Sequence, residues 1–346
     1  MRDKSIKIPV DQNFNQFKSK RAYELEDQKG DEYKKYREKW VQNPKNFILE
    51  DGPINLDIEI TNCCNLKCPM CPRTVMINDN VPVNGGNFNT GFMEFSLYKS
   101  LIDQAVELGI KAVKLNWLGE PTMHKDLVKM VAYAKDKGIL DVLINTNGVF
   151  VNKKIAKELI EAGLDKLLFS FDSPYKEDYE KIRIGADYEE VIENIKYVNK
   201  LRNDLNKINP ITRVSMVMMR ENQHQFKDFL DMFKDHVDIV AWSEYTNKEE
   251  LLGDERKRIK RKKIKNFACA QLWQRMFVSW NGNIAVCCAD VKMEYAIGNA
   301  FKEKLKDIWK NDRYQYLRNM HMEGKYDSIP ICSKCDMPEF YEEAKK

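Results

Sequence analysis

The stretch Thr61-Asn-Cys-Cys-Asn-Leu-Lys-Cys-Pro-Met-Cys-Pro-Arg73 decides the fold and the chemistry of this chain. It directly follows residues 54–60, where apolar and polar side chains alternate as they do in a β-strand. Cys64, Cys68 and Cys71 have the spacing C-x3-C-x2-C, so three thiolates lie close enough to hold three corners of a 4Fe–4S cube. No fourth cysteine continues the run, which leaves one iron open to chelate a small molecule. The alternatives are a zinc site and unconnected buried cysteines.

Strands and helices alternate along the chain after this motif. The hydrophobic pattern predicts six strands, near residues 54–60, 112–117, 141–146, 166–172, 211–219 and 237–243. Helices are predicted near residues 94–108, 124–137, 153–162, 176–183, 188–203 and 222–234. This alternation predicts a parallel α/β fold, and right-handed crossovers would wind it into an open sheet or a barrel. The pattern alone does not choose between those two.

The cysteine spacing, with Asn65-Leu66 before Cys68 and Pro72-Arg73 after Cys71, resembles the motif of the radical SAM superfamily. This resemblance implies a partial (β/α)6 TIM-like barrel with its chemistry at the carboxyl ends of the strands. In that family the open iron binds the amino and carboxylate groups of S-adenosylmethionine, and an electron from the cluster releases a 5′-deoxyadenosyl radical. We assign Cys64 rather than Cys63 as a ligand because Cys64 gives the family spacing.

Further motifs occur where the resemblance would place them. Leu118-Gly-Glu-Pro121 resembles the family's G-G-E-P segment, with Leu118 in place of the first glycine. Similar motifs end the next two strands, and Arg183 stands where relatives often carry a carboxylate-binding arginine. The resemblance therefore implies that S-adenosylmethionine is bound by Gly119, Glu120, Pro121, Thr146, Asn147, Ser170, Asp172 and Arg183.

A second group of cysteines lies near the C-terminal end of the sequence. A C-x2-C pair and two distant cysteines, namely Cys269, Cys287, Cys332 and Cys335, suit either structural zinc or a second 4Fe–4S cluster. The region resembles the SPASM/twitch extension of radical SAM enzymes, which implies one auxiliary 4Fe–4S cluster. Residues 277–286 predict a hairpin, with Asn281-Gly282 as a type I′ turn. Cys288 is either a packed residue beside a ligand or a thiol that donates a hydrogen atom to a substrate radical.

The chain of 346 residues divides into four predicted segments. Residues 1–50 form a helical extension, 51–247 the radical SAM core, 248–265 a basic linker and 266–346 a small cysteine-bearing auxiliary-cluster domain. The alternative for the basic run is a patch that receives an anionic substrate. A net charge of +4 does not suggest nucleic-acid binding.

The sequence also bears on the compartment in which the protein works. No apolar stretch approaches the ~20 residues of a membrane span, and the first residues are too polar for a secretory signal. Clustered cysteines are typical of metal ligands in a reducing compartment, so we expect a cytoplasmic protein.

The expected function is that of a radical SAM oxidoreductase. It would abstract a hydrogen atom from a small polar substrate, sugar-like or aminocyclitol-like, and thereby cause dehydrogenation or epimerisation. A reducing partner such as flavodoxin or ferredoxin would supply the electron. One alternative is a peptide maturase that acts on a ribosomal precursor. Another, of a different class, is a non-catalytic iron–sulfur protein for electron transfer or redox sensing.

Overall fold

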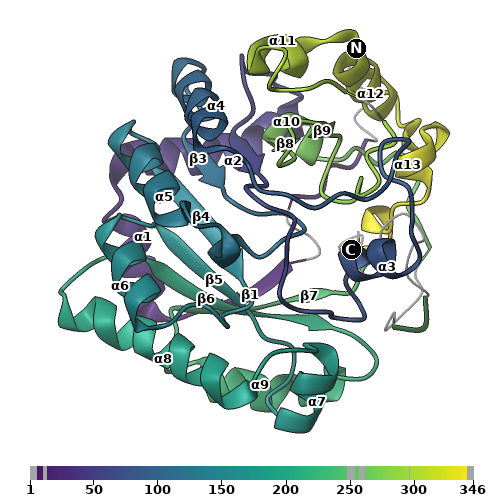
Figure 1. Ribbon diagram of the computed structural model, residues 1–346. Helices are drawn as coiled ribbons and strands as arrows, with labels where there is room; N and C mark the ends of the chain where they lie inside the picture. Colours follow the sequence, from purple (N-terminus) through teal and green to yellow (C-terminus); the bar gives the residue numbers. More distant parts are fainter. Residues whose placement is uncertain (1–5, 11–13, 248–253, 257–261, 296, 341–346) are drawn as a thin grey trace.

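The protein is built around one nine-stranded sheet, whose arrangement can be followed in Figure 1. The computed structural model describes residues 6–10, 14–247, 254–256, 262–295 and 297–340. The strand order is β1-β7-β6-β5-β4-β3-β2-β8-β9. The six strands from β2 to β7 follow one another in sequence order and are all parallel. They are β2 (Asn55–Ile58), β3 (Ala112–Lys114), β4 (Asp141–Thr146), β5 (Lys166–Ser170), β6 (Ile211–Met218) and β7 (Ile239–Glu244). The predicted partial (β/α)6 barrel is therefore confirmed.

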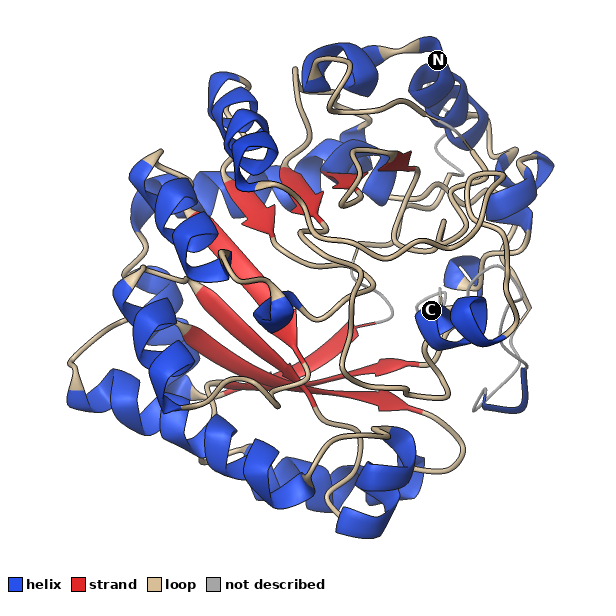
Figure 2. Ribbon diagram, in the orientation of Figure 1, coloured by secondary structure: helices blue, strands red, loops and turns tan. Residues whose placement is uncertain are grey.

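Helices cover the outer face of these parallel strands, as Figure 2 shows. They are α4 (Phe95–Glu107), α5 (Leu127–Asp136), α6 (Lys153–Glu161), α7 (Lys176–Ile182), α8 (Tyr188–Asp204) and α9 (Phe226–Phe233). Each lies within a few residues of its predicted range. The N-terminal ends of α6 and α8 are capped by the side chains of Asn152 and Asp187, which accept hydrogen bonds from free backbone N–H groups.

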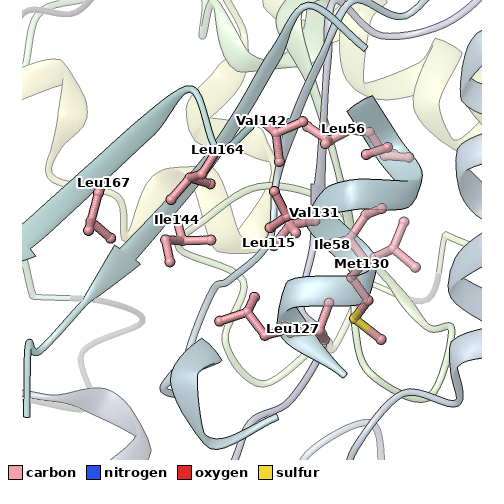
Figure 3. Close-up of a cluster of buried hydrophobic side chains, with 14 of the residues drawn as sticks. Leu56, Ile58, Leu115, Leu127, Met130, Val131, Val142, Ile144, Leu164 and Leu167 are labelled. Atoms are coloured by element: carbon pink, nitrogen blue, oxygen red, sulfur yellow. The ribbon is translucent and has the colours of Figure 1, made fainter. Parts of the chain in front are cut away.

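The main hydrophobic core lies between the strands and these helices (Figure 3). Leu56, Ile58, Val142 and Ile144 of the strands are fully buried there. Because side chains alternate along a strand, the residues between them face the inside of the barrel. The alternation therefore decides which side chains can line an internal cavity.

The N-terminal segment differs from the prediction in one respect. It contains the helices α1 (Lys20–Asp27) and α2 (Gly30–Asn46), but β1 (Phe14–Lys18) is a strand, antiparallel to β7. The predicted helical extension thus contains a strand as well, which the sequence did not indicate because this short polar strand gains its partner only from the distant edge of the barrel.

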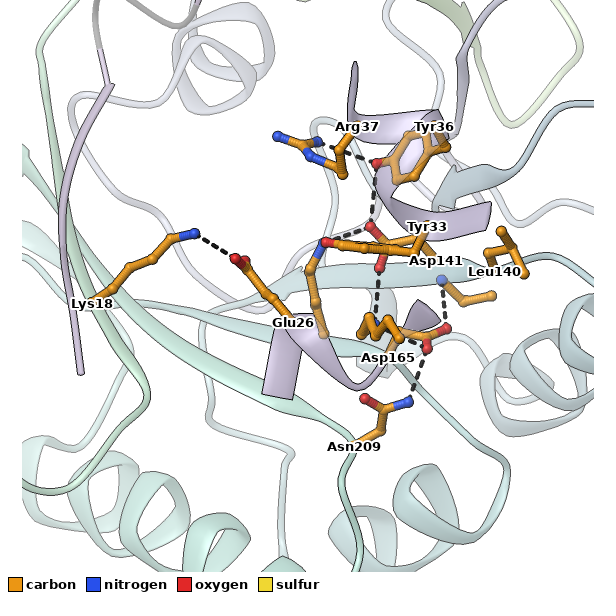
Figure 4. A network of polar contacts seen from close by, with 12 residues as sticks. Lys18, Glu26, Tyr33, Tyr36, Arg37, Leu140, Asp141, Asp165 and Asn209 are labelled. Carbon is orange, nitrogen blue, oxygen red and sulfur yellow. Dashed lines mark hydrogen bonds and ion pairs between the residues drawn. The ribbon is translucent and has the colours of Figure 1, made fainter. Parts of the chain in front are cut away.

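The extension also closes the amino-terminal end of the barrel (Figure 4). Tyr33 and Tyr36 of α2 are buried, and Tyr36 donates a hydrogen bond of 3.2 Å to Asp141 at the start of β4. Lys166 at the start of β5 donates to Asp141 as well. The segment is thus part of the barrel rather than an exposed addition.

The C-terminal segment extends the same sheet. Its strand β8 (Arg275–Val278) pairs in parallel with β2, and β9 (Ile284–Ala285) pairs antiparallel with β8. The remaining helices of this part are α10 (Gln271–Gln274), α11 (Leu305–Lys310), α12 (Asp312–Met322) and α13 (Pro330–Ser333). The sheet consequently runs without a break from the predicted core into the predicted auxiliary domain.

The hairpin is confirmed, but its turn type is not. A type I′ turn needs positive φ at both central residues, whereas Gly282 (φ 85°) has positive φ and Asn281 does not. The Gly282 N–H donates to the Ser279 carbonyl, and the Ser279 N–H donates to the Asn283 carbonyl, both over 2.8 Å. This is a type I turn followed by a glycine bulge, since the loop is longer than two residues.

Most of the predicted basic linker lies outside the described residues, apart from 254–256 and 262–265. Neither interpretation of that run is tested. Along the described parts of the chain, no helix has the length and apolar character that crossing a membrane requires. Short 3-10 helices occupy Pro121–Met123, Gln223–Gln225, Asp254–Arg256, Tyr326–Ser328 and Met337–Glu339.

Candidate iron–sulfur and cofactor site

A cavity of about 390 Å³ lies at the carboxyl ends of the barrel strands. The three cysteines of the first motif and most of the predicted cofactor contacts line it together. These residues are Cys64, Cys68, Cys71, Gly119, Glu120, Thr146, Asn147, Ser170 and Arg183. Pro121 and Asp172 are not part of the lining. Four loops that are distant in sequence thus meet where a parallel barrel carries its chemistry.

The cysteine loop runs from the end of β2 to helix α3 (Pro72–Asn78). The Cys71 N–H donates to the Cys68 carbonyl over 3.0 Å, which turns the chain just before the helix. Pro72 occupies the first turn of α3, where its fixed φ suits a helix start. The loop is therefore folded by its own sequence and by the proline that ends it.

Gly119 lets the second loop approach the cysteine loop closely. A Cβ atom at this position would lie 2.1 Å from the Thr61 carbonyl oxygen and 2.8 Å from the Cys63 carbonyl oxygen. The next residue, Glu120, donates its N–H to the Cys63 carbonyl over 2.8 Å. The glycine of the motif is thus required for packing against the cysteine loop.

The Glu120 carboxylate ties this second loop to the end of β4. Its Oε1 accepts hydrogen bonds from the N–H and hydroxyl of Thr122 and from the hydroxyl of Thr146 (2.7 Å). Its Oε2 accepts from the Asn147 N–H over 2.7 Å, which leaves a lone pair for one further donor. Burial raises the pKa of Glu120, although these donors favour its charged form. An ammonium group is the kind of donor that would complete this set.

Arg183 lies beside the first cysteine cluster and is held by Asp172. Its Nε and Nη2 each approach Asp172 Oδ2 to 2.6 Å, while its Nη1 lies 4.0 Å from Cys68 Sγ. Burial, the largest effect, would lower the pKa of Arg183, but the charge and hydrogen bond of Asp172 together with the charges of Cys68 and Tyr179 raise it. Asp172 Oδ1 accepts from the Val217 N–H over 2.8 Å. Of the predicted pair, Ser170 faces the cavity, whereas Asp172 is fully buried behind Arg183.

The second group of cysteines gathers between the hairpin and the last helices. The Cys335 N–H donates to the Cys332 carbonyl over 3.2 Å, and the Cys269 N–H donates to His321 Nδ1 over 3.1 Å. Burial, followed by the charges of neighbouring thiols, raises the pKa of Cys287 and Cys332. Buried thiols of this kind become thiolates when a metal is bound, because the metal compensates their charge.

The distances between the thiol sulfurs distinguish a site for a single zinc ion from a site for a larger metal cluster. Sulfurs around a tetrahedral zinc ion, each about 2.3 Å from the metal, are about 3.8 Å apart. Among the cysteines, all of which are described, no three sulfurs lie within 4.8 Å of one another. Neither group of cysteines therefore has three thiols at the spacing of a single zinc ion.

The cavity also has lining residues outside the predicted cofactor contacts, and of the three described here only Cys288 was a candidate in the sequence. Cys288 lines it, which places a thiol of the second group in the cavity of the first. Lys114 and Arg275 also line it, from β3 and β8. Strand alternation could have signalled Lys114, since it lies two residues before Asn116, but only the closed barrel shows that this face lines a cavity.

The first strand of this parallel barrel leads into three cysteines beside a polar cavity. These features define an iron–sulfur protein that binds a small polar cofactor. The chain belongs to the Radical SAM superfamily, whose family model matches residues 58–233. A second model, for an iron–sulfur cluster-binding domain, matches residues 269–336. The predicted cofactors are thereby confirmed as a 4Fe–4S cluster with S-adenosylmethionine and a second 4Fe–4S cluster.

Curated relatives have several activities. A GTP 3′,8-cyclase of Limosilactobacillus fermentum is 34% identical over 191 residues, covering 54% of this chain and 53% of the cyclase. The match thus spans about half the length of that relative. An S-adenosyl-L-methionine-dependent 2-deoxy-scyllo-inosamine dehydrogenase of Niallia circulans is 23% identical, covering 81% of this chain and 92% of the dehydrogenase. A tungsten-containing aldehyde ferredoxin oxidoreductase cofactor-modifying protein of Pyrococcus furiosus is 23% identical, with 82% and 88% covered.

Solved structures show the same fold. BtrN in complex with AdoMet and 2-DOIA has a TM-score of 0.55 at 20% identity, covering 83% of this chain and 94% of that one. SuiB of Streptococcus suis bound to S-adenosylmethionine has a TM-score of 0.59 at 18% identity, covering 84% and 73%. At these identities the likeness concerns the fold alone.

Proposed function

We propose that this protein is a radical SAM oxidoreductase that abstracts a hydrogen atom from a small polar substrate, sugar-like or aminocyclitol-like. The observation that carries the proposal is the shared cavity. Cys64, Cys68 and Cys71 line it from one side, and Cys288 lines it from the cysteine-rich C-terminal segment. A substrate in this cavity would lie between the two groups of cysteines, close to both.

In this proposal each group of residues has a defined task. Cys64, Cys68 and Cys71 hold the first cluster, and Cys269, Cys287, Cys332 and Cys335 hold the auxiliary one. When bound, the first cluster supplies the electron that cleaves S-adenosylmethionine to a 5′-deoxyadenosyl radical, and the auxiliary cluster accepts an electron. The division into core, linker and auxiliary domain remains part of this proposal.

The chain's own groups would orient the cofactor. Gly119 and Glu120 offer a backbone and a carboxylate to its ammonium group, with Pro121 fixing their turn. Arg183, positioned by Asp172, offers a guanidinium group to its carboxylate. Thr146, Asn147 and Ser170 offer hydroxyl and amide groups at the ends of β4 and β5. A cofactor and substrate that fill the cavity would exclude bulk water from it, which would protect a reactive radical.

The class of substrate is inferred from the remaining lining of the cavity. Asn116, Asn145 and Ser243 supply amide and hydroxyl groups that suit a molecule with several hydroxyl or amino groups. The relative with 92% of its length covered acts on such an aminocyclitol according to its name. A cytoplasmic location and a reducing partner such as flavodoxin or ferredoxin complete the proposal.

Cys288 separates the two expected outcomes, dehydrogenation and epimerisation. Its sulfur accepts a hydrogen bond from Gln271 Nε2 over 3.4 Å, and the residue lines the cavity. A thiol there would be able to return a hydrogen atom to a substrate radical, which gives epimerisation. Without donation from Cys288, the substrate radical would lose a proton and one electron, the electron passing to an auxiliary cluster held by the C-terminal cysteines, and the product would be oxidised.

The test uses metabolites from cells grown in deuterated medium. The holoenzyme, S-adenosylmethionine and a reductant are incubated with a small-molecule fraction, and 5′-deoxyadenosine is measured by mass spectrometry. We expect deuterium in the 5′-deoxyadenosine. A peptide fraction of the same cells is tested in parallel, with and without protease treatment. Deuterium transfer only from the peptide fraction, abolished by the protease, would contradict the proposal and favour a peptide maturase.

A further inference from the structure

A second cavity of about 400 Å³ continues the first toward the amino-terminal end of the barrel. Lys114, Asn145 and Arg275 line both cavities, so the two meet inside the barrel. The N-terminal segment supplies the far wall with Phe14 and the two tyrosines of α2, whose surroundings Figure 4 shows. A molecule whose reacting carbon lies near the cysteines could therefore extend into this second space.

The lining of the second cavity is strongly basic. It contains six basic side chains and two acidic ones, Glu26 and Asp141. Several of the basic groups have carboxylate partners nearby. Lys18 pairs with Glu26 at 2.7 Å, Lys166 pairs with Asp141, and Arg275 binds Asp57 through Nε at 2.8 Å. These pairs neutralise part of the charge but not all of it.

Arg37 donates a hydrogen bond to the Tyr36 hydroxyl over 3.3 Å. Lys114 and Arg213 are the two remaining cations of this lining. Lys114 comes from β3 and Arg213 from β6, and both face the lumen because their neighbours Val113 and Val214 are buried in the core against the helices. Across the described residues, neither side chain has a hydrogen bond or an ion pair. Arg213 lies over the ring of Phe14 at 4.6 Å, and its buried Nε has no acceptor.

Burial lowers the pKa of both groups. Burial lowers the pKa of Lys114 to about 8, and the charges of Arg275 and Arg213 add to this effect against the opposing charge of Asp57. Burial likewise lowers the pKa of Arg213 to about 10. Buried charges without partners are unfavourable, so a bound anion would stabilise both at once.

We propose that the lumen binds an anionic group of the substrate, a phosphate or a carboxylate, between Lys114 and Arg213. This inference rests on the proposed function, because the anionic group would anchor the molecule whose other end lies near the cysteines. Charge-assisted hydrogen bonds from an ammonium and a guanidinium group suit both kinds of anion. The substrate class narrows to acidic or phosphorylated small polar molecules.

The test is a calorimetric titration of the holoenzyme, saturated with S-adenosylmethionine, at low ionic strength to limit screening. Inorganic phosphate is the probe in one arm and succinate in the other. We expect saturable binding of at least one of them, and the arm that binds identifies the kind of anion. Lys114→Met and Arg213→Met should each weaken that binding by about tenfold or more, since each removes a charged partner.

Two further variants serve as controls. Lys196→Met removes an exposed lysine on α8 and should bind the anion like the wild type. Lys114→Arg keeps the charge and should retain most of the binding that Lys114→Met loses. Circular dichroism checks that each variant is folded. Absence of saturable binding to the wild type, or equal binding by wild type and both Met variants, would overturn the anion subsite.

Release of 5′-deoxyadenosine by the wild type tests the proposed function separately. Release of 5′-deoxyadenosine without anion binding overturns the subsite and leaves the radical chemistry standing. Anion binding that depends on Lys114 and Arg213, but without release, overturns the proposed function and leaves the subsite standing.

Discussion

Gly119 shows how the absence of a single atom, the Cβ, can decide the geometry of the site. Its position is close to the cysteine loop, and the φ angle of this residue is not in the left-handed region. The requirement for glycine is therefore one of space. The neighbours are backbone atoms of Thr61, Asn62 and Cys63, which cannot rotate away as a side chain would.

We expect Gly119→Ala to destabilise the protein by about 3 kcal/mol or more, since overpacking usually costs up to about that much and here displaces backbone. Less iron should be retained after reconstitution. Gly86→Ala is the matched control, because a Cβ there meets only the Val83 carbonyl oxygen at 4.0 Å. Melting temperature and iron content are measured for both. Equal melting temperatures for the two variants would contradict the requirement for close approach.

Glu59 is a residue whose role the sequence did not reveal. It is buried where β2 meets the hairpin, and its carboxylate accepts hydrogen bonds from the Leu118 N–H (3.0 Å) and the Ser279 hydroxyl (3.1 Å). Burial outweighs these donors and raises the pKa of Glu59 to about 7. The folded protein therefore holds a proton on Glu59 at pH values where the unfolded chain has lost it.

The contribution of Glu59 to stability is complete below its unfolded pKa of 4.5 and is lost as the pH rises toward about 7. The loss is at most about 3 kcal/mol, at 1.36 kcal/mol per pKa unit. We expect Glu59→Gln to flatten the fall in the free energy of unfolding over this window. Denaturant unfolding from pH 4 to 8 measures it. Parallel pH profiles for variant and wild type would show that Glu59 titrates normally.

At the scale of elements, strand β8 joins the cysteine-rich C-terminal segment to the barrel. Arg275 of β8 binds Asp57 of β2 through two nitrogens, and the Asp57 side chain is fully buried. Removing one partner of such a pair leaves an uncompensated charge, whereas removing both does not. The pair is therefore a direct probe of the contact between the two segments.

Asp57→Ala should destabilise the protein by about 3 kcal/mol, the lower end for a broken buried pair, because Arg275 is partly exposed to the lumen. The double variant Asp57→Ala with Arg275→Leu should recover part of this loss. Asp231→Ala, which breaks an exposed pair with Lys234, is the control and should leave the melting temperature unchanged. A double variant no more stable than Asp57→Ala would contradict this account of the contact.

The elements also show what could be predicted from sequence and why. Strand β4 was predicted at its observed residues because its apolar pattern is local and turn residues bound it. Strand β1 was missed because its pairing with β7 joins distant parts of the chain. The cysteine spacing located the first site, but Asp172 was expected in the cavity. Alternation along a strand predicts which face a side chain lies on. It does not predict that another side chain will cover it, as Arg183 covers Asp172.

At the scale of the whole molecule, the first three cysteines and Cys288 of the C-terminal segment line one cavity. If each group holds a 4Fe–4S cluster, the reconstituted protein should contain about eight irons. The double variant Cys332→Ala with Cys335→Ala should retain about four, because the first group does not depend on these residues. Iron and zinc are counted by mass spectrometry. About four irons together with one zinc in the wild type would contradict the auxiliary cluster.

The arrangement of the whole barrel explains why the class of substrate could not be predicted from the sequence. Lys114 and Arg213 lie on strands that are distant in sequence, and in the sequence each resembles an ordinary charged residue of a strand. Only closure of the barrel brings them into one lumen with Arg275. A local sequence motif indicates the cofactor chemistry, whereas the substrate pocket forms only when all the strands assemble.

The central claim is that Cys64, Cys68 and Cys71 start radical chemistry on S-adenosylmethionine. The direct measurement is 5′-deoxyadenosine released by the anaerobically reconstituted and reduced protein, compared with Cys68→Ala and with the Cys332→Ala and Cys335→Ala double variant. We predict release by the wild type, none by Cys68→Ala, and some by the double variant, whose first cluster is intact. No release by the wild type with its irons in place, or equal release by Cys68→Ala, would contradict the claim.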